Sequence, residues 1–273
     1  MRARTMRKPQ LPPDKYSLYQ AAVQDPVHDA FLYAKFFRLA RGFEARELRE
    51  DFCGTFALSC EWVKANESNS ALALDLDPEP LRFGKDHAYQ DLSIEERSRL
   101  RVLRKNVIST TRPSIDLIVA GNFSFFYFQE RSLLLDYFRH CLASLKPRRG
   151  ALILDMIGGP ETIRTGTERR VIRNPSTGKF TYTWETRDFD PISNRVQYVI
   201  HFELENGKSF RNAFTYDWRL WSIREVRDLL AEAGFKSSRV VWDVAASPDR
   251  EKHVLKESGA NLESWIAYVV GLS

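Results

Sequence analysis

Carboxylates and a glycine turn stand together early in the chain, and their spacing indicates a nucleoside-binding site. Glu50 and Asp51 precede the turn Cys53-Gly54-Thr55, and Asp75 follows the turn by about twenty residues. A strand, a tight turn, a helix and a second strand that ends in a carboxylate form the arrangement by which doubly wound proteins hold an adenosine. In that arrangement Asp75 accepts hydrogen bonds from both ribose hydroxyls; the alternative is that Asp75 caps the next helix.

The single glycine of this turn, Gly54, bears on which ligand the site can hold. A dinucleotide pyrophosphate normally requires three glycines, because backbone amides must approach the phosphates closely. An adenosine ligand without phosphates tolerates the loss of the other two, so S-adenosylmethionine fits the pattern better than NAD. Glu50 or Asp51 is placed to meet the ammonium group of that ligand through a charge-assisted hydrogen bond.

Polar residues also follow two later strands of the predicted sheet. Asn106 and Val107 end the third strand, where an amide side chain and a backbone N–H can read the adenine edge; a local asparagine turn is the alternative. Asn122 follows the fourth strand, beside the expected switch in strand order, and is placed to touch the cofactor or the incoming nucleophile. The phenylalanines after Asn122 either exclude water from the reacting sulfur or belong to the core.

A catalytic base, if the reaction needs one, is expected from an aromatic segment later in the chain. The candidates are His201, Tyr198, Tyr216 and Arg219. A lone histidine in a strand is more often structural than catalytic. Arg219 lies between two tryptophans, where it holds a substrate carboxylate, stacks on a ring or forms a buried ion pair.

The composition is that of an ordinary soluble protein. A chain of 273 residues with 43% hydrophobic and 28% charged residues suits one enlarged domain. Part of the net charge of +5 lies in residues 1–15, which we expect to form a basic flexible tail, so the charge supports a nucleic-acid partner only weakly. Without an apolar run of membrane or signal-peptide length, and without paired cysteine spacing, the chain is expected to be cytoplasmic and to hold no metal.

Alternating strand and helix patterns predict the scaffold that positions these residues. The alternation is typical of a parallel sheet with helices on both faces. A helix from Ser17 to Arg41 is expected to precede this sheet. Strands are expected near 45–51, 70–75, 100–106, 115–120 and 151–156, with helices near 55–66, from Pro78 with Asp77 as its cap, and near 130–145.

The period of the sequence changes after Gly158-Gly159-Pro160. Polar and apolar residues then alternate, with a hairpin signal at Asn206-Gly207. We therefore expect an antiparallel insertion at about 160–217, which packs over the carboxyl ends of the parallel strands and lines the acceptor pocket. A capped helix from Ser222 to Gly234 and strands near 238–246 and 263–270 should complete the sheet.

The motifs described above carry a family resemblance. Arg49-Glu50-Asp51-Phe52-Cys53-Gly54-Thr55, Asp75-Leu76-Asp77-Pro78, Asn122-Phe123-Ser124 and Tyr216-Asp217-Trp218-Arg219-Leu220-Trp221-Ser222 together resemble class I S-adenosylmethionine-dependent methyltransferases, especially small-molecule-type members with a β insertion after the fifth strand. The resemblance covers about residues 16–270. It departs from the family at Cys53 and Phe56, where glycines are common.

The resemblance implies an α/β fold with a seven-stranded Rossmann-like methyltransferase sheet, an antiparallel β insertion and an N-terminal helical cap, in one domain at 16–273. It also implies methyl transfer from S-adenosylmethionine to a small-molecule acceptor by in-line displacement, with S-adenosylhomocysteine as the product. Tyr16, Tyr19, Val23 and Gln24 look like the substrate-side cap of such enzymes. Taken together, the expected cofactor-binding residues are Tyr19, Arg49, Glu50, Asp51, Cys53, Gly54, Thr55, Asp75, Leu76, Asn106, Val107, Asn122 and Phe123, and the catalytic candidates are Asn122, His201, Tyr216 and Arg219.

Two other functions stay open at this point. The basic tail and Asn122-Phe123-Ser124-Phe125 favour a nucleic-acid or protein methyltransferase, although this segment lacks both prolines of the Asn-Pro-Pro-aromatic loop of amino methyltransferases. A binding or regulatory protein that kept the fold without turnover is the third hypothesis. A pocket roofed by the insertion would favour a small-molecule acceptor, whereas an open basic groove would favour nucleic acid.

Overall fold

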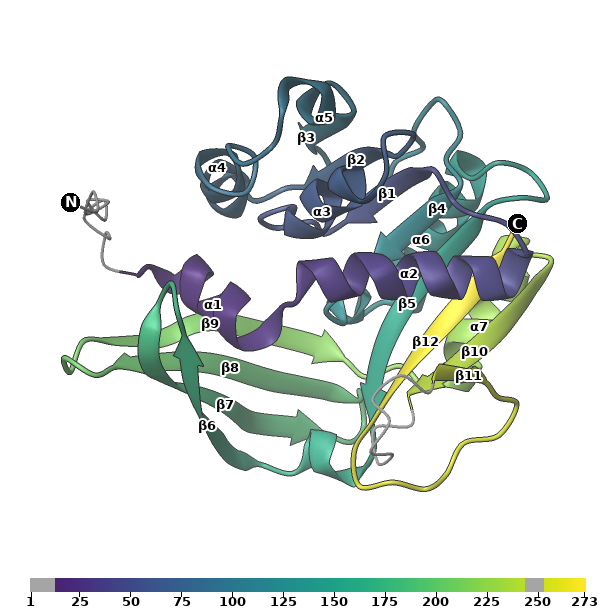
Figure 1. The fold of residues 1–273 in the computed structure, drawn as a ribbon. Coiled ribbons are helices and arrows are strands. Elements are labelled where there is room, and N and C mark those ends of the chain that lie inside the picture. The colour runs from purple at the N-terminus through teal and green to yellow at the C-terminus, as the bar shows by residue number, and fades with distance from the viewer. Residues whose placement is uncertain (1–12, 244–252) are drawn as a thin grey trace.

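A mostly parallel sheet forms the centre of the molecule (Figure 1). The structure is a computed structural model that describes residues 13–243 and 253–273. Within these ranges the main sheet has eight strands in the order β11-β10-β12-β5-β4-β1-β2-β3. The strands are β1 (Glu47–Asp51), β2 (Ser70–Asp75), β3 (Leu100–Arg104), β4 (Leu117–Ala120), β5 (Ala151–Gly158), β10 (Ser237–Asp243), β11 (His253–Leu255) and β12 (Trp265–Leu272).

The direction of the strands places a switch point between β1 and β4. Strands β3, β2, β1, β4 and β5 run parallel, whereas β12 runs antiparallel to both β5 and β10. The chain builds outward from β1 to β3 and then returns to the other side of β1 with β4, and ligands bind outside the carboxyl ends of strands at such a reversal. The expected Rossmann-like sheet is confirmed, and it gains the short edge strand β11.

Helices cover both faces of this sheet, since its central strands are buried on both sides. All four residues of β4 are buried. Helices α2 and α3 pack together over one face, and α6 and α7 pack together over the other. The helices are α1 (Lys15–Val23), α2 (Pro26–Arg41), α3 (Ala57–Ala65), α4 (Pro78–Asp86), α5 (Ile94–Ser98), α6 (Arg131–Ser144) and α7 (Ile223–Ala233), with 3-10 turns η1 (Ser124–Tyr127) and η2 (Pro160–Ile163).

The expectation of one helix from Ser17 to Arg41 is wrong, because the chain breaks between α1 and α2. Pro26 has no backbone N–H to continue the preceding helix, and its fixed φ suits the first turn of a new one. The Asp25 side chain caps that new helix by accepting the His28 N–H at 3.1 Å. The break lets α1 leave the main sheet and lie against the insertion (Figure 1).

The insertion between β5 and α7 is a separate four-stranded antiparallel sheet, as expected. Gly207 of the predicted hairpin has a φ of 82°, which suits a tight turn between twisted strands. Leu18 of α1 is fully buried against aromatic residues of this sheet, including Phe180 and Phe202. The strands are β6 (Gly166–Asn174), β7 (Gly178–Asp190), β8 (Arg195–Leu204) and β9 (Ser209–Arg219).

The predicted basic tail and the possibility of a membrane span are the two remaining expectations. Residues 1–12, which make up most of the predicted basic tail at 1–15, lie outside the described residues. None of the helices in the described ranges has the length and apolar character that crossing a membrane requires.

Candidate functional site

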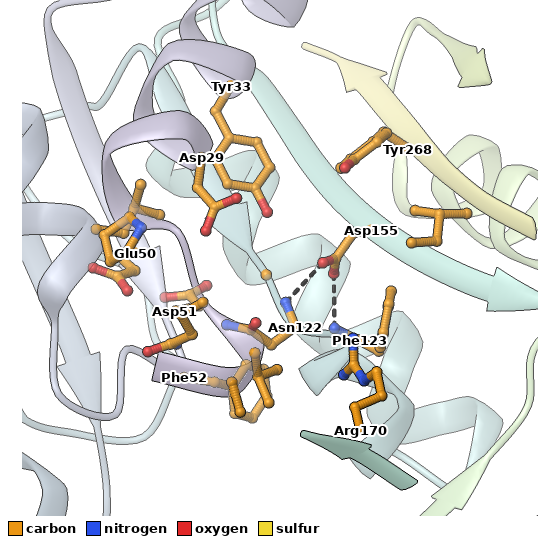
Figure 2. Close-up of a pocket in the computed structure, with 17 residues that line it drawn as sticks. Asp29, Tyr33, Glu50, Asp51, Phe52, Asn122, Phe123, Asp155, Arg170 and Tyr268 are labelled. Carbon is orange, nitrogen blue, oxygen red and sulfur yellow. Dashed lines mark hydrogen bonds between the residues drawn. The ribbon is translucent and has the colours of Figure 1, made fainter. Parts of the chain in front are cut away.

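A cavity of about 290 Å³ opens at the carboxyl ends of β1, β4 and β5, where the strand order reverses (Figure 2). Its walls come from the α1–α2 junction, the loops after β1 and β4, the strands β5 and β12, and β6 of the insertion. The lining residues are Ala22, Val23, Gln24, Pro26, Asp29, Tyr33, Glu50, Asp51, Phe52, Leu58, Gly121, Asn122, Phe123, Asp155, Arg170, Ile266 and Tyr268.

The backbone of the two loops beside the cavity is strained. Phe52 and Phe56 after β1, and Asn122 and Phe123 after β4, have φ angles between 45° and 58°, a region that side chains disfavour. Strain of this kind costs about 1–3 kcal/mol per residue and clusters at functional sites. Gly54 has a φ of 52° without that penalty, and the position of a Cβ on it has no atom within 4 Å, so this turn is open to a ligand.

Asp155 of β5 holds the strained loop after β4 in place. Its two carboxylate oxygens accept the backbone N–H groups of Asn122 at 2.7 Å and Phe123 at 2.8 Å (Figure 2). Burial raises the pKa of Asp155 to about 7, although these two hydrogen bonds lower it. Each oxygen of a carboxylate has two acceptor sites, so Asp155 can still bind a ligand.

Like Asp155, Glu50 of β1 both makes structural hydrogen bonds and lines the cavity. Its carboxylate accepts hydrogen bonds from the Ser59 N–H, at 2.9 Å, and from the Ser59 hydroxyl. Glu50 thereby caps the first turn of α3, and it also lines the cavity. Burial raises the pKa of Glu50 to about 8, and the hydrogen bonds from Ser59 oppose this shift. The β1 end of the cavity therefore presents a buried carboxylate.

Helix α2 contributes a third carboxylate and a phenol. Burial, followed by the neighbouring Asp25, raises the pKa of Asp29 to about 6. A Cβ on Gly121 would stand 2.8 Å from the Tyr33 hydroxyl, so the absence of a side chain at Gly121 lets this phenol approach the loop after β4. The Tyr268 ring of β12 packs edge-on against the Tyr33 ring, with 6.3 Å between their centroids.

The turn after β1 is tied to the tip of β2 and to α1. Asp75 accepts the Gly54 N–H at 2.7 Å and the Asp77 N–H at 2.9 Å. Asp77 itself caps α4 by accepting the Glu79 N–H at 2.9 Å, so the helix cap and the carboxylate at the strand tip are different residues. The ribose role of Asp75 stays a prediction. Within the turn Cys53 is buried and Thr55 accepts a hydrogen bond from Gln20 of α1 at 2.9 Å, while Leu76 is exposed.

Arg49 and Asp51 form a buried ion pair at 2.7 Å on the sheet face opposite Glu50. Arg49 also donates to the Val107 carbonyl at 2.7 Å, and Asp51 accepts the Tyr137 hydroxyl at 2.9 Å. Together with further hydrogen bonds from the Arg49 guanidinium, these contacts use every donor group of Arg49, whereas Asp51 also lines the cavity but has its charge neutralised by Arg49. Of the two predicted ammonium partners, the geometry favours Glu50.

In the loop after β3, Asn106 forms a local turn, which was the alternative to reading the adenine edge. The Asn106 side-chain oxygen accepts the Ile108 N–H at 2.8 Å, and the Val107 carbonyl is used by Arg49. Neither Asn106 nor Val107 lines the cavity.

Of the four catalytic candidates, the structure brings only Asn122 to the cavity. His201 lies in the insertion, where its Nε2 is 2.9 Å from Glu185 and its Nδ1 accepts the Asn212 N–H at 3.0 Å. Both imidazole nitrogens therefore have partners within the insertion, away from the cavity. This is the structural role that is more common for a lone histidine in a strand.

Tyr216 and Arg219 also have structural surroundings. The Tyr216 ring packs on Trp218 with 4.5 Å between centroids, and burial raises its pKa well above the usual range. Arg219 stacks over Trp221 at 3.6 Å and donates to the Gln129 carbonyl at 3.0 Å. Tyr19, the predicted cofactor contact from the cap, packs on Phe214 of the insertion and does not line the cavity. The aromatic cluster of the insertion was expected to line the pocket, but the insertion residue that lines this cavity is Arg170.

Sequence reasoning missed five lining residues that carry most of the charge and polarity of the cavity. Asp155 had a signal, because it ends a predicted parallel strand as Asp75 does. Asp29 and Tyr33 are four apart and share a face of α2, but that face is visible only once the helix break is known. Tyr268 and Arg170 had no local signal, because both reach the cavity only through the tertiary fold. Tyr268 arrives by the pairing of β12 with β5, which sets it beside Asp155, and Arg170 arrives with β6 through the tertiary packing of the insertion.

Comparisons with known proteins rest on structure alone. No protein-family model matches the chain, and no curated protein matches it in sequence. Among solved structures, DesVI of Streptomyces venezuelae matches with a TM-score of 0.69 at 18% identity, covering 94% of this chain and 96% of its own. The sugar N-methyltransferase KedS8 of Streptoalloteichus sp. ATCC 53650 matches with a TM-score of 0.66 at 17% identity, covering 100% and 97%.

The SAM-bound amino pentose methyltransferase CalS10 of Micromonospora echinaspora is similar over the same length. Its TM-score is 0.68 at 14% identity, and the match covers 97% of this chain and 100% of that one. These matches include the insertion as well as the main sheet, since they span almost the whole of each chain. The chain therefore has the fold of the class I S-adenosylmethionine-dependent methyltransferases.

Proposed function

We propose that this chain is an S-adenosylmethionine-dependent methyltransferase that acts on a small-molecule acceptor. The observation that carries the proposal is the charge of the cavity at the switch point. Asp29, Glu50, Asp51 and Asp155 line it, of which Asp51 is paired with the buried Arg49, and Arg170 is the one cation among the described residues that do. A diphosphate would further oppose the ionisation of the three unpaired carboxylates, whereas the sulfonium and ammonium groups of S-adenosylmethionine would stabilise their charged forms.

We assign residues to this cofactor in the order that the sequence predicts. Glu50 would accept a hydrogen bond from the ammonium group, Asp75 would accept those of the ribose hydroxyls, and the open face of Gly54 leaves room for the chain between them. When bound, the cofactor supplies a methyl group activated by its positively charged sulfur. The protein then has to align the acceptor and exclude water, which Phe52 and Phe123 do from two walls of the cavity.

A small acceptor is supported by the enclosure of the site. Gln24 and Pro26 of the α1–α2 junction and Arg170 of the insertion lie around the cavity together with the main sheet. The volume of about 290 Å³ is at the lower end for small-molecule pockets. Two of the similar structures are named as methyltransferases of a sugar and of an amino pentose, and acceptors of that size support the same reading here.

Two measurements test the proposal. Isothermal calorimetry should show that S-adenosylhomocysteine binds and that NAD does not, because NAD places a diphosphate against the carboxylates. Glu50→Gln should weaken the binding, since it removes the charge that meets the ammonium group. Binding of NAD, or no binding of S-adenosylhomocysteine, would refute the cofactor assignment.

A transfer assay separates the enzyme from a cofactor-binding protein without turnover. Protein incubated with methyl-labelled S-adenosylmethionine and a library of small acceptors should release labelled product and S-adenosylhomocysteine. Transfer to nucleic acid or to protein substrates, with none to small molecules, would instead support the alternative acceptor class.

A further inference from the structure

The far end of the cavity, away from the β1 turn, contains Asp155, and Asp29 lies close enough to act on both Asp155 and Glu50. Figure 2 shows Glu50 and Asp155 on opposite sides of Asn122, with Asp29 and Tyr33 reaching in from α2. Resting on the proposed function, we infer that the acceptor is an amine, which binds as its ammonium form between Asp29 and Asp155 with the Tyr33 and Tyr268 phenols beside it.

The position of Asp155 assigns this end of the cavity to the acceptor. Glu50 adjoins the turn that leads to Gly54 and Asp75, which is where the nucleoside is proposed to lie. Asp155 stands two strands away on β5, against the loop that carries Asn122. A second ligand that approaches the methyl group from the other side therefore meets Asp155 and Asp29.

The charges at this end select a cation over a neutral acceptor. Neither Asp29 nor Asp155 forms an ion pair with a described residue, and the nearby Asp29 raises the energy of ionising Asp155. The groups that interact electrostatically with Asp155 are Tyr19 of α1, Asp29 and Tyr33 of α2 and Tyr268 of β12, while Glu50 of β1 and Arg170 of β6 line the same cavity.

Arg170 belongs to this group, but its guanidinium already stacks over the Tyr182 ring at 4.8 Å. An ammonium group would supply the missing positive charge and would donate hydrogen bonds to carboxylate and phenol oxygens. A hydroxyl offers one donor and no charge, so it leaves the repulsion between the two carboxylates in place.

Asp155 can also remove a proton from the bound ammonium group, which frees the nitrogen lone pair that attacks the methyl group. One N–H bond of the ammonium group breaks, the proton forms an O–H bond with the Asp155 carboxylate, and the bonding pair becomes the lone pair of a neutral amine. Burial raises the pKa of Asp155 to about 7, which suits a base that exchanges a proton near neutral pH. The two N–H groups of Asn122 and Phe123 keep the carboxylate in position during this exchange.

The test uses the full chain saturated with S-adenosylhomocysteine and measures the binding of matched probes by calorimetry. Glucosamine is paired with glucose, and cyclohexylamine with cyclohexanol. Each amine should bind about tenfold more tightly than its alcohol, because charge-assisted hydrogen bonds are roughly twice as strong as neutral ones. Titrations in buffers of different ionisation heat should also show proton release, since a bound cation ionises the carboxylates.

Two variants connect this preference to the named residues. Asp29→Asn and Asp155→Asn should each abolish most of the preference for amines while S-adenosylhomocysteine still binds. Asp29→Asn is the safer of the two, because Asp155→Asn also changes an acceptor of two backbone N–H groups. Asp217→Asn is the matched control, since Asp217 pairs with Arg195 on the surface and should leave the preference unchanged.

The outcomes separate this inference from the proposed function. If S-adenosylhomocysteine binds but amines bind no better than alcohols, the inference is wrong and the cofactor assignment stands. The same holds if both variants keep the preference. Failure of S-adenosylhomocysteine to bind the unmodified chain would overturn the proposed function itself, and the inference with it.

Discussion

Adjacent carboxylates at the end of β1 serve different purposes because successive side chains of a strand point to opposite faces. Asp51 points into the face covered by α6, where Arg49 and Tyr137 satisfy it. Glu50 points to the other face, where it caps α3 through Ser59 and still meets the cavity. The buried ion pair therefore holds β1 to the loop after β3, while Glu50 keeps acceptor capacity for a ligand.

Asp75 offers the sharpest test at the scale of one residue. Asp75→Ala should weaken the binding of S-adenosylhomocysteine roughly 10- to 100-fold, because each hydrogen bond to a charged group contributes about 1.5–3 kcal/mol. Calorimetry measures this directly. Asp77→Ala is the control, since it removes the α4 cap, which costs about 1 kcal/mol of stability, and should leave affinity almost unchanged. Unchanged affinity in Asp75→Ala would refute the ribose assignment.

The pH dependence of stability should follow the buried carboxylates. Burial raises the pKa of Asp155 to about 7 and that of Glu50 to about 8, so between pH 5 and pH 7 the folded state binds more protons than the unfolded state. The free energy of unfolding should therefore fall as pH rises, by up to about 1.4 kcal/mol per pH unit for each protonated group.

Urea unfolding of the ligand-free protein at several pH values checks this expectation. Asp155→Asn should flatten the decline between pH 5 and pH 7, because an amide does not titrate there. Asp217→Asn on the surface should retain the slope of the unmodified chain. A free energy of unfolding that stays constant over this interval would show that the carboxylates are already ionised in the folded state.

Helix α4 packs so closely on the β1 turn that its glycine determines the shape of the site. A Cβ on Gly84 would overlap the Thr55 carbonyl and stand 2.5 Å from the Phe56 ring. Gly84→Ala should therefore cost about 1–3 kcal/mol of stability through overpacking, and it should also weaken S-adenosylhomocysteine binding, because the displaced backbone belongs to the turn.

Gly207→Ala is a matched control for this element. Gly207 has a φ of 82° with no atom within 4 Å of its Cβ position, so the variant adds backbone strain in the insertion hairpin without touching the turn. Denaturant unfolding and calorimetry on both variants should show that stability falls in each, whereas affinity falls only in Gly84→Ala. Equal affinities would mean that the turn does not contact the ligand.

Local patterns predicted the elements well, because their signals act over a few residues. The predicted strand at 70–75 matches β2, and the cap at Asp77 and the capping box at Ser222 are as expected. The helix break at Pro26 was the main error, since an apolar stripe that continued through the proline outweighed the proline itself. The capping residue Asp25 before Pro26 was the overlooked signal.

The side chains of the cavity were harder to predict than the elements, because they meet through strand order and packing. The carboxyl ends of β1, β4 and β5 converge only once the order of the sheet is known, and Arg170 arrives from a different sheet. In the insertion, alternation identified the strands but did not say which face packs inward. His201 and Tyr216 were therefore predicted at the site, although their side chains bond and pack within the insertion.

At the scale of the molecule, three parts of the structure meet at the cavity. The main sheet supplies the loops after β1 and β4, the insertion supplies Arg170, and the α1–α2 junction lies over both (Figure 1). Gln20 of α1 joins this junction to the β1 turn through the Thr55 hydroxyl at 2.9 Å. A ligand in the cavity therefore contacts all three parts at once.

Hydrogen exchange should report this convergence. Binding of S-adenosylhomocysteine should slow amide exchange in residues 20–33, 52–58 and 121–126, because local opening of these segments would then require loss of the ligand. Exchange in α7 and β10, on the other side of the sheet order, should stay the same. Asp75→Ala at the same ligand concentration should show little protection. Slowing spread evenly over the whole chain would indicate global stabilisation without closure around the ligand, and would contradict the role given to the α1–α2 junction.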